Sequence, residues 1–417
     1  MPKGHIITGL DIGSGTIKIL VAKKNKEGIE AISQIEEKSL GIRRGVVVDL
    51  EGVSNIFKTA FSRLREETGQ KIDGVYVNVG GSHLFSTPSH GIISVSRADQ
   101  KISEEDVNRV LQAAQTFSLP SNKEIFDAFP KEFVVDGQGG IKEVLGLQGV
   151  RLEVEILALG GFAPYLKNLT QTILNSDLQI LDMIPSPIAA ARAVLTPRQK
   201  ELGVAVLDIG AGTSNLAVFE EGDLIHLAIL PIGSNNITND IALGLKTDID
   251  VAERIKIEYG NCLFKGPNKR EKIEIGEDSN PPSTLPSASW RMGPSEPLIF
   301  FRKQLVEIIE ARVSEIFREV NKELKKIGKE KLLPAGLVLT GGGAKLPKMV
   351  ELAKKEFKLP AKLGKPKGIL ELDDPSLATV CGLVLEGADL EEEKRTGLEF
   401  GKGIGSKIKR IFKIFIP

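Results

Sequence analysis

Two short glycine-rich turns carry residue types that bind phosphate. The first reads Asp11-Ile-Gly-Ser-Gly-Thr16 and the second reads Asp208-Ile-Gly-Ala-Gly-Thr213. Glycine lets backbone N–H groups converge on an anion, and neighbouring hydroxyl groups add further donors. The aspartate at the start of each turn would face the same anion, and two carboxylates beside a polyphosphate suit Mg²⁺ held largely through its own water. We therefore predict two phosphate loops around a shared magnesium ion.

The donors of these loops can be named from the sequence. Besides its aspartate, the first loop offers Ser14, Gly15, Thr16 and Lys18, and the second offers Gly210, Ala211, Gly212, Thr213 and Ser214. A single turn of this kind is equally well explained as a structural hairpin, because glycine favours tight turns. Two copies at corresponding positions favour phosphate binding.

A third glycine cluster follows an apolar run near residue 340. Gly341, Gly342 and Gly343 come directly after this expected strand, and Leu346–Phe357 then has helical spacing, with Pro347 near the first turn. Backbone exposed at such a helix start can meet a phosphate or lie against a sugar and base. The alternative is an ordinary loop between a strand and a helix.

The elements around these turns repeat. Each of the first two turns lies between apolar runs, which predicts strand, tight turn and strand in both halves of the chain. The fold class is therefore predicted to be α/β, with a duplicated domain and a cleft between the two lobes.

The amino-acid composition of the chain excludes several classes of protein. The 417 residues hold 55 Lys plus Arg against 55 Asp plus Glu, so we expect no overall basic surface and no nucleic-acid partner. The hydrophobic share of 41% is that of a globular chain, and the length suggests about three domains. Cys262 and Cys381 are too few for a disulfide framework, which indicates a reducing compartment. We expect a cytosolic chain without a signal peptide or a membrane-spanning segment.

The C-terminal segment 401–417 departs from this balance, with five basic residues and no acidic side chain. On a helical wheel one face is shared by Ile404, Ile408, Ile411, Phe412 and Phe415, and Lys409, Arg410 and Lys413 lie away from that face. The side chains predicted to meet anionic lipids are Ile404, Lys407, Ile408, Lys409, Arg410, Ile411, Phe412, Lys413 and Phe415. Such a basic amphipathic helix is typical of a membrane interface, and the polar stretch 389–400 would serve as its linker. A terminal helix docked on its own domain is the alternative.

The motifs together resemble those of the actin, sugar-kinase and DnaK-type chaperone superfamily, and in detail those of the FtsA family of actin-like bacterial cell-division proteins. The glycine turns carry the broader likeness. The narrower one covers most of the chain and rests on the segments Gly41–Asp49, Val75–Gly81, Pro130–Asp136, Gly149–Glu155, Ile237–Ala242, Ala252–Gly260 and Ile308–Arg312.

This resemblance implies an actin-like ATPase fold, in which duplicated ribonuclease-H-like lobes surround a nucleotide cleft. The first-lobe core would be residues 1–83 and 163–200, with an inserted α/β subdomain at 84–162 for self-association and division-protein contacts. The second-lobe core would be 201–246 and 309–388, with a further insert at 247–308. Two helices would cross between the lobes, near Pro187–Leu195 and Ser376–Gly387, where small residues permit close approach.

The resemblance also implies ATP and Mg²⁺ as cofactors. Asp11 and Asp208 would position the metal and water for a weak ATPase, and Gly13 would join the first phosphate loop. Glu253 and Lys256 would reach the ribose and base, and Gly341, Gly342, Gly343 and Lys345 would meet the adenosine. Without the family, the pair Glu253 and Lys256 would be interpreted as a solvated ion pair one helical turn apart.

One residue, at the start of the first crossing helix, differs from the residue found there in some relatives. Some relatives have an acidic residue before the proline that opens the first crossing helix, where it orients the attacking water, whereas this chain has Ser186 before Pro187. Serine is neither a base at neutral pH nor a strong orienting group for water. We therefore predict firm ATP binding with slow or negligible hydrolysis.

The function implied by the family is an adaptor that polymerises at the division septum, on the cytoplasmic face of the inner membrane. It would tether the FtsZ ring and recruit later division proteins. The second-lobe insert would bind the FtsZ C-terminal peptide, with Arg302 and Arg312 as anchors for its acidic groups, although each could equally lie on a solvated helix face. Residues 265–297, rich in Pro, Ser and Gly, are predicted to form a flexible excursion.

Two other functions remain compatible with parts of this pattern. A PilM-like adaptor of type IV pilus assembly would share the lobes and the insert but would not need the basic tail. A sugar-kinase-like phosphotransferase would need an aspartate base in a substrate pocket, and the sequence offers no candidate for it.

Overall fold

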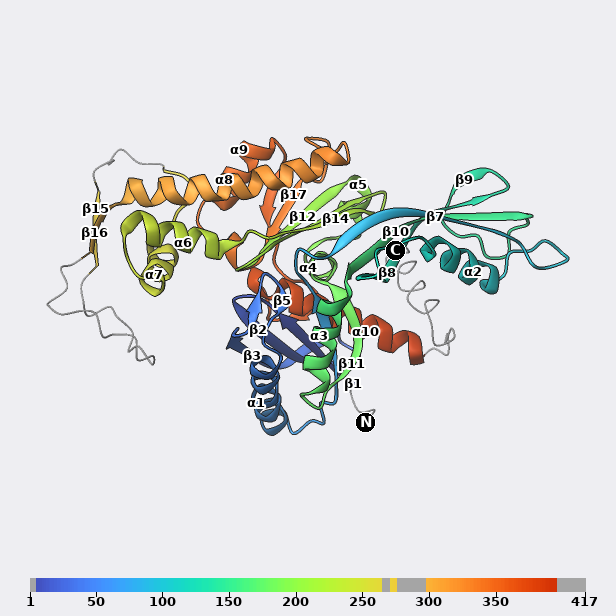
Figure 1. Cartoon of the computed structure of the whole chain (residues 1–417), viewed down its shortest axis with the longest axis horizontal. Helices are drawn as coiled ribbons and strands as arrows, with labels where there is room; N and C mark the ends of the chain where they lie inside the picture. Colours follow the sequence, from blue (N-terminus) through green and yellow to red (C-terminus); the bar gives the residue numbers. More distant parts are fainter. Residues whose placement is uncertain (1–4, 265–270, 276–297, 396–417) are drawn as a thin grey trace.

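The computed structural model describes residues 5–264, 271–275 and 298–395, and two sheets of the same plan lie at its centre (Figure 1). The first has the strand order β11-β6-β1-β2-β3-β19. Its strands are β1 (His5–Ile12), β2 (Thr16–Lys24), β3 (Ile29–Lys38), β6 (Gly74–Val79), β11 (Gln179–Pro185) and β19 (Ile369–Leu370). In it β1, β2 and β3 form an antiparallel meander, and β6 and β11 continue the sheet in parallel with β1.

The second sheet repeats this topology, with the order β14-β13-β12-β17-β18. Its strands are β12 (Val204–Ile209), β13 (Ser214–Glu220), β14 (Asp223–Leu230), β17 (Leu337–Thr340) and β18 (Ala361–Leu363). Here β12, β13 and β14 are antiparallel, and β17 and β18 run parallel to β12. All residues of β12 and β17 are buried, as expected for central strands covered on both faces. The predicted duplicated α/β fold is confirmed.

Helices cover the sheets through apolar stripes. In the first lobe α1 (Leu50–Thr68) packs beside α3 (Ala163–Leu174). Asp49 caps the first turn of α1, and the left-handed Gly69 ends it. The second lobe carries α5 (Pro197–Leu202), α6 (Ser234–Leu245), α7 (Ile249–Tyr259), α8 (Arg302–Lys326) and α9 (Met349–Phe357).

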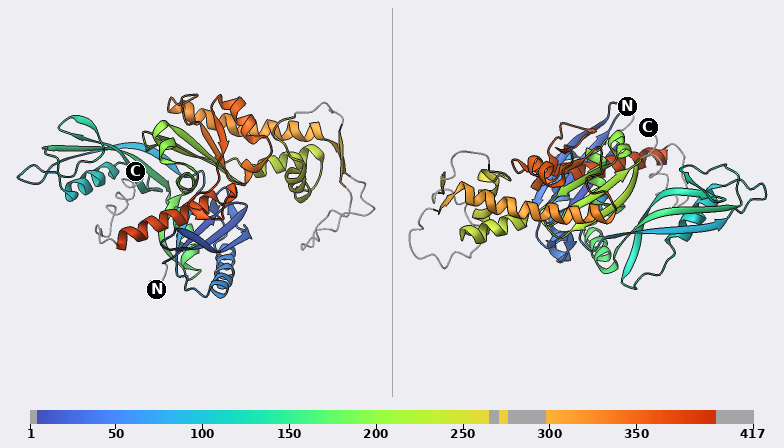
Figure 2. Two further views of the ribbon diagram at one scale, coloured as in Figure 1. Left: turned by 180° about the vertical axis from the view of Figure 1, so that it is seen from behind. Right: turned by 90° about the horizontal axis from the view of Figure 1, so that it is seen from above.

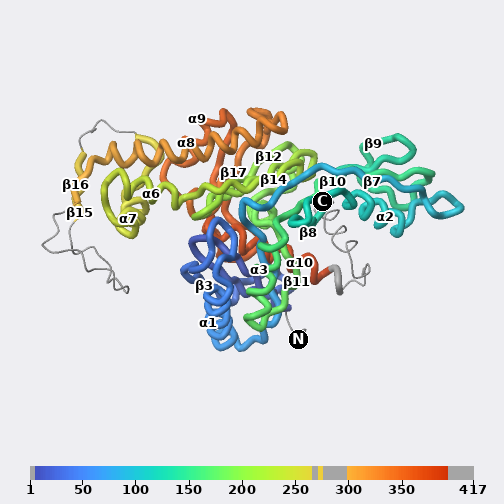
Figure 3. The backbone as a smooth tube through the Cα atoms, in the orientation of Figure 1, coloured from blue at the N-terminus to red at the C-terminus, as the bar shows by residue number. Residues whose placement is uncertain are grey.

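Two helices cross between the lobes and pack against each other. They are α4 (Ser186–Val194) and α10 (Ala378–Arg395), the latter preceded by the short 3-10 turn η3 (Pro375–Leu377). The red helix α10 runs between the two lobes in Figure 1, in the left view of Figure 2 and in the backbone tube of Figure 3. The predicted linker 389–400 needs correction, because Asp389–Arg395 continues α10. Glu391 accepts from the Tyr76 hydroxyl at 3.0 Å and Lys24 bonds Glu392 at 2.8 Å, so this last part of α10 is held on the first lobe.

The inserted subdomain is a four-stranded sheet with its own core. It comprises β7 (Phe85–Ser94), α2 (Glu104–Gln115), β8 (Lys123–Val135), β9 (Gln138–Ile141) and β10 (Arg151–Phe162). The chain enters the subdomain after the glycine pair Gly80-Gly81 and leaves it near a second pair, Gly160-Gly161. The subdomain extends to one end of the molecule, opposite α7 (Figure 1). It also contacts the second lobe, because Ser86 Oγ donates to the carbonyl of Leu227 in β14 at 3.1 Å.

Two smaller hairpins complete the described elements: β4 (Ile42–Arg43) with β5 (Val46–Val47), and β15 (Lys272–Ile275) with β16 (Leu298–Phe301). Residues 271–275, which include β15, are the described part of the predicted excursion 265–297. Residues 265–270 and 276–297 and the predicted membrane segment 401–417 lie outside the described part of the chain. The predicted boundaries at 200/201 and 308/309 fall inside the continuous helices α5 and α8. No helix among the described residues is long and apolar enough to cross a bilayer.

Candidate nucleotide site

The two predicted phosphate loops have the same local structure. Each connects antiparallel strands, and in each a glycine N–H closes the turn: Gly13 donates to the carbonyl of Thr16 at 3.2 Å, and Gly210 donates to that of Thr213 at 2.9 Å. The aspartates occupy equivalent positions one residue before the end of the entering strand. Asp11 lies across from Lys18, and Asp208 lies across from Asn215.

The tips of the two loops meet across the cleft. A Cβ on Gly15 would lie 2.7 Å from Cβ of Ala211, and a Cβ on Gly212 would lie 2.8 Å from Cβ of Ser14. The Ser14 hydroxyl in turn accepts from the N–H of Gly45 at 2.8 Å. Glycine is therefore required at positions 15 and 212 for the lobes to approach as closely as they do.

The third glycine cluster closes the cleft from the second lobe. Gly341 follows β17 with φ of 85°, and a Cβ there would overlap the Asp208 carboxylate. The chain then forms a 3-10 turn, η2 (Gly342–Lys345), and α9 begins only at Met349, so the helix start predicted at Leu346 is displaced. Lys345 pairs with Asp374 at 2.7 Å at the rim.

These three segments line one cleft with a volume of about 1030 Å³. That volume suits a nucleotide-sized ligand. Every residue predicted to bind nucleotide lines it except Ser214. Ser214 is fully buried and its hydroxyl donates to the carbonyl of Ile232 at 2.8 Å, so this prediction was wrong. The reason is strand alternation, because neighbouring side chains in β13 point to opposite faces.

Burial raises the pKa of both aspartates in the cleft, Asp11 and Asp208. Burial raises the pKa of Asp11 to about 7, with Lys18 opposing the shift and Asp208 and Glu36 adding to it. Burial also raises the pKa of Asp208, against the hydrogen bond from Asn215. Two nearby buried carboxylates ionise together more readily when a cation joins them, so the pair fits Mg²⁺. Among the described residues no group of three or more His, Cys, Asp or Glu could hold a metal ion. Mg²⁺ is commonly bound through one or two carboxylates and keeps several of its own waters.

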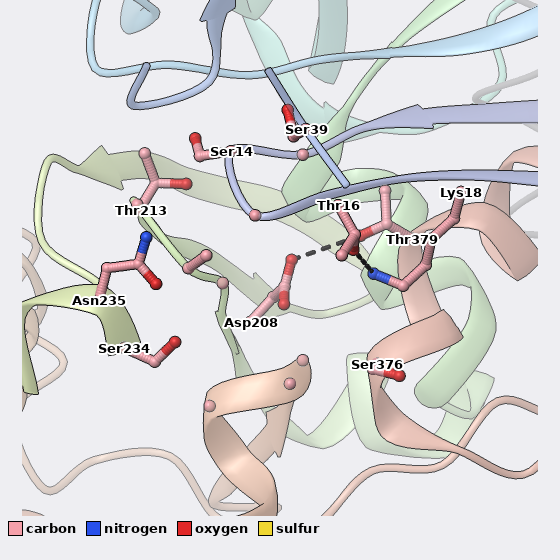
Figure 4. A pocket seen from close by; sticks show the side chains of 18 of the residues that line it. Ser14, Thr16, Lys18, Ser39, Asp208, Thr213, Ser234, Asn235, Ser376 and Thr379 are labelled. Atoms are coloured by element: carbon pink, nitrogen blue, oxygen red, sulfur yellow. Dashed lines mark hydrogen bonds between the residues drawn. The ribbon is translucent and has the colours of Figure 1, made fainter. Parts of the chain in front are cut away.

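Each carboxylate is linked to the start of a crossing helix. For Asp11 the link is Asn78 of β6, which donates to Asp11 at 2.9 Å and to the Ser186 hydroxyl at 3.1 Å. For Asp208 it is Thr379 of α10, which donates at 3.3 Å, as the dashed line in Figure 4 shows. Asn78, Asn215 and Thr379 were not predicted as site residues. Asn78 lies within the segment Val75–Gly81, which was noted only for the family resemblance.

The opposite end of the cleft is formed by α6 and α7. Lys256 pairs with Glu253 at 2.6 Å and donates to Thr238 at 2.8 Å. Only 5% of Lys256 is exposed, whereas 43% of the Glu253 side chain is, so the lysine end of the pair is buried and the carboxylate end faces solvent. Ile249 and Ile257 also line this part of the cleft, although both are more than half exposed. An ionic pair flanked by apolar side chains suits a ligand with both a polar ribose and an apolar base.

The two arginines predicted to bind a partner are already paired within the chain. Arg302 bonds Glu271 at 2.8 Å. Arg312 bonds Asp240 of α6 through two nitrogens, at 2.5 and 2.9 Å, and Glu315 at 2.5 Å. Arg312 therefore joins α8 to α6.

Known proteins resemble this chain over nearly its whole length. The chain is 34% identical to a cell division protein FtsA of Pseudomonas aeruginosa, with 94% of this chain and 91% of that protein covered. It is 33% identical to the corresponding protein of Bacillus subtilis, with 92% and 84% covered. Among solved structures, one of the PilM-PilN type IV pilus biogenesis complex matches with a TM-score of 0.63 at 16% identity, covering 91% of this chain and 98% of that one.

A second solved structure, MreB5 of Spiroplasma citri bound to ADP, matches with a TM-score of 0.56 at 15% identity, covering 96% of this chain and all of that one. At such identities these structures show the fold alone, which is actin-like. The family pattern described as "Cell division protein FtsA" matches residues 205–382, and that of the "SHS2 domain inserted in FTSA" matches residues 81–159, the inserted subdomain. The chain therefore belongs to the FtsA family of cell division proteins, built on the actin-like fold.

Proposed function

We propose that this protein binds Mg-ATP in the cleft and polymerises on the cytoplasmic face of the inner membrane, where it tethers the FtsZ ring at the division septum and helps recruit later division proteins. The observation that carries the nucleotide part is the convergence of three glycine-rich turns and two buried aspartates on one cleft of about 1030 Å³. In it the loop tips would hold the phosphates, and Glu253, Lys256 and Gly341–Gly343 would hold the adenosine.

Magnesium bridging the phosphates would neutralise charge on the polyphosphate. The residues present fit it, because Asp11 and Asp208 are buried carboxylates whose ionic forms a cation would favour. The hydroxyl of Ser186 donates to the carbonyl of Val79 at 3.1 Å and accepts from Asn78, which supports slow hydrolysis. A buried serine engaged in this way offers no base to an attacking water.

Filament formation is supported by the shape of the chain. The inserted subdomain and the α6–α7 end of the second lobe lie at opposite ends of the long axis (Figure 1). Head-to-tail contacts between such ends give open filaments when the rotation does not close. The basic segment 401–417 would bind anionic lipid, where each basic residue contributes about 1 kcal/mol, and polymerisation would add avidity.

The two arginines predicted to anchor the FtsZ peptide differ in how firmly each is paired within the chain. Within the described part of the chain, Arg302 pairs with Glu271, at the base of the β15–β16 hairpin. An acidic peptide group could replace that carboxylate. Arg312, engaged by two carboxylates, is better suited to holding α8 on α6.

The test is vesicle sedimentation of the full chain with anionic liposomes, with and without Mg-ATP, and in the presence of FtsZ. The full chain should pellet with the vesicles, more strongly with Mg-ATP, and should carry FtsZ with it. A variant ending at Phe400 should remain in the supernatant while still binding ATP. Equal pelleting of the full and truncated chains would contradict the membrane role, and absence of ATP binding would contradict the nucleotide role.

A further inference from the structure

Asp208 is held by two donors on the same oxygen atom. Asn215, its cross-strand neighbour in β13, donates through Nδ2 to Oδ2 at 3.1 Å. The Thr379 hydroxyl of α10 donates to the same Oδ2 at 3.3 Å (Figure 4). The two donors come from different elements and fix the orientation of the carboxylate.

Among the residues that the structure describes, the other end of the Asn215 amide finds no hydrogen-bond partner. Asn215 is 6% exposed, lines the cleft, and its Oδ1 is buried without a donor. The orientation of this amide is decided by Asp208, because a carboxylate accepts and must therefore face the amide nitrogen. A buried acceptor without a donor is unfavourable, so a bound ligand that supplies a donor here would be favoured.

The donor cannot be the phosphate chain of a nucleotide, whose oxygens only accept at neutral pH. The Lys18 ammonium group has three donors; it bonds the Thr16 hydroxyl at 2.7 Å and lies 3.7 Å from the Glu36 carboxylate, and it makes no hydrogen bond to Asn215 Oδ1 in this structure. Ribose hydroxyls and the adenine amino group belong to the α6–α7 end in the proposed function. Water is the remaining donor at the phosphate end.

We propose that Asn215 Oδ1 accepts a hydrogen bond from a water molecule held beside Asp208, so that Asn215 positions both the carboxylate and the water. Thr379 positions the carboxylate only. This inference rests on the proposed nucleotide function. The water has two sources, the hydration shell of magnesium or the molecule that attacks the terminal phosphate.

The experiment compares two variants of the full chain. Asn215→Leu removes the donor to Asp208 and the acceptor for water, whereas Thr379→Val removes a donor alone and keeps the side-chain shape. Affinity for a non-hydrolysable ATP analogue is measured by calorimetry in MgCl₂ and in EDTA, and phosphate release from ATP is followed in a single turnover.

If the water belongs to magnesium, Asn215→Leu should lose about tenfold in affinity in MgCl₂ and remain unchanged in EDTA. If the water is the attacking one, affinity should hold and phosphate release should slow by about tenfold. Thr379→Val should change the affinity in MgCl₂ less than threefold in the first case, and the rate of phosphate release less than threefold in the second. Asn215→Val replaces the leucine variant if that one does not fold, because a β-branched residue suits a strand.

Two outcomes overturn the assignment. One is wild-type behaviour of the Asn215 variant in every arm, and the other is an equal loss in both variants, which would mean that Asn215 acts only through Asp208. Failure of the wild-type chain to bind the analogue would instead contradict the proposed function itself.

Discussion

Gly382 of α10 and Ala189 of α4 touch where the crossing helices meet. A Cβ on Gly382 would overlap the carbonyl group of Ala189, whose backbone cannot move without displacing α4. The flanking residues Ala190, Ala193 and Cys381 are also small and buried. The junction between the lobes is thus a backbone contact that only glycine permits at position 382.

We expect Gly382→Ala to lower the free energy of unfolding by about 1–3 kcal/mol or more, because overpacking forces the helices apart. Urea unfolding followed by circular dichroism measures the effect. Gly139→Ala in the inserted subdomain is the matched control, since a Cβ there would meet no atom closer than 3.6 Å. Equal stability of the two variants would mean that the helices separate at little cost.

A second prediction concerns the loop tips. Gly15→Ala should weaken ATP binding by roughly tenfold, because its Cβ would lie 2.7 Å from Cβ of Ala211 and would hold the loops apart. The double variant Gly15→Ala with Ala211→Gly removes the opposing methyl group and should recover most of the affinity. Calorimetry with Mg-ATP gives both values. A double variant as weak as the single one would locate the effect within the first loop.

A third prediction concerns the contact between the inserted subdomain and the second lobe. Lys142 pairs with Asp223, which is 5% exposed, and burial raises the pKa of Asp223 against the influence of that lysine. Lys142→Met should destabilise the docked subdomain by about 1–3 kcal/mol, because a buried carboxylate loses its donor. Faster proteolytic cleavage near Gly80-Gly81 should report the loosened contact.

Adding Asp223→Asn to Lys142→Met tests the cause. The amide does not carry the charge that is costly to bury, so the double variant should be more stable than the single one. Greater loss in the double variant would show that Asp223 serves a partner other than Lys142.

A fourth prediction concerns pH. Burial lowers the pKa of Lys200 to about 8, while Glu386 raises it and Arg192 lowers it, and Lys200 lies 4.7 Å from the ring centre of Phe219. Between pH 8 and the ordinary lysine pKa, the unfolded chain binds more protons at this position than the folded chain does. Stability contributed by Lys200 must therefore rise with pH in that window.

The free energy of unfolding is measured in urea at pH 8, 9 and 10. The difference between wild type and Lys200→Met should grow in favour of wild type by up to about 1.4 kcal/mol per pH unit. Lys58→Met, at an exposed position of α1, should show no such trend relative to wild type. A constant difference between wild type and Lys200→Met would mean that Lys200 stays protonated in the folded protein throughout this range.

Much of the site could be predicted because its requirements are local. A turn that presents backbone N–H groups needs glycine within a few residues of a hydroxyl and an aspartate, and both copies of that pattern are contiguous in sequence. The repeat also predicted the duplicated lobes, since the same turn needs the same pair of flanking strands.

Predictions from the sequence were wrong where tertiary packing overrides a local pattern. Ser214 belongs to the second motif by sequence, yet the pleat of β13 turns it toward Ile232. Asp389–Arg395 has the composition of a linker, yet contacts with β2 and β6 extend α10 through it. Lys256 has the spacing of a surface ion pair, yet α6 covers it.

The sequence by itself determined the paired glycine-rich turns, the duplicated fold and the family, because each depends on residue types at short, fixed spacings. Only the tertiary structure decided how the aspartates are supported. Asn78 reaches Asp11 across 67 residues, and Thr379 reaches Asp208 across 171. Such contacts depend on how sheets and crossing helices pack, and no spacing along the chain encodes that distance.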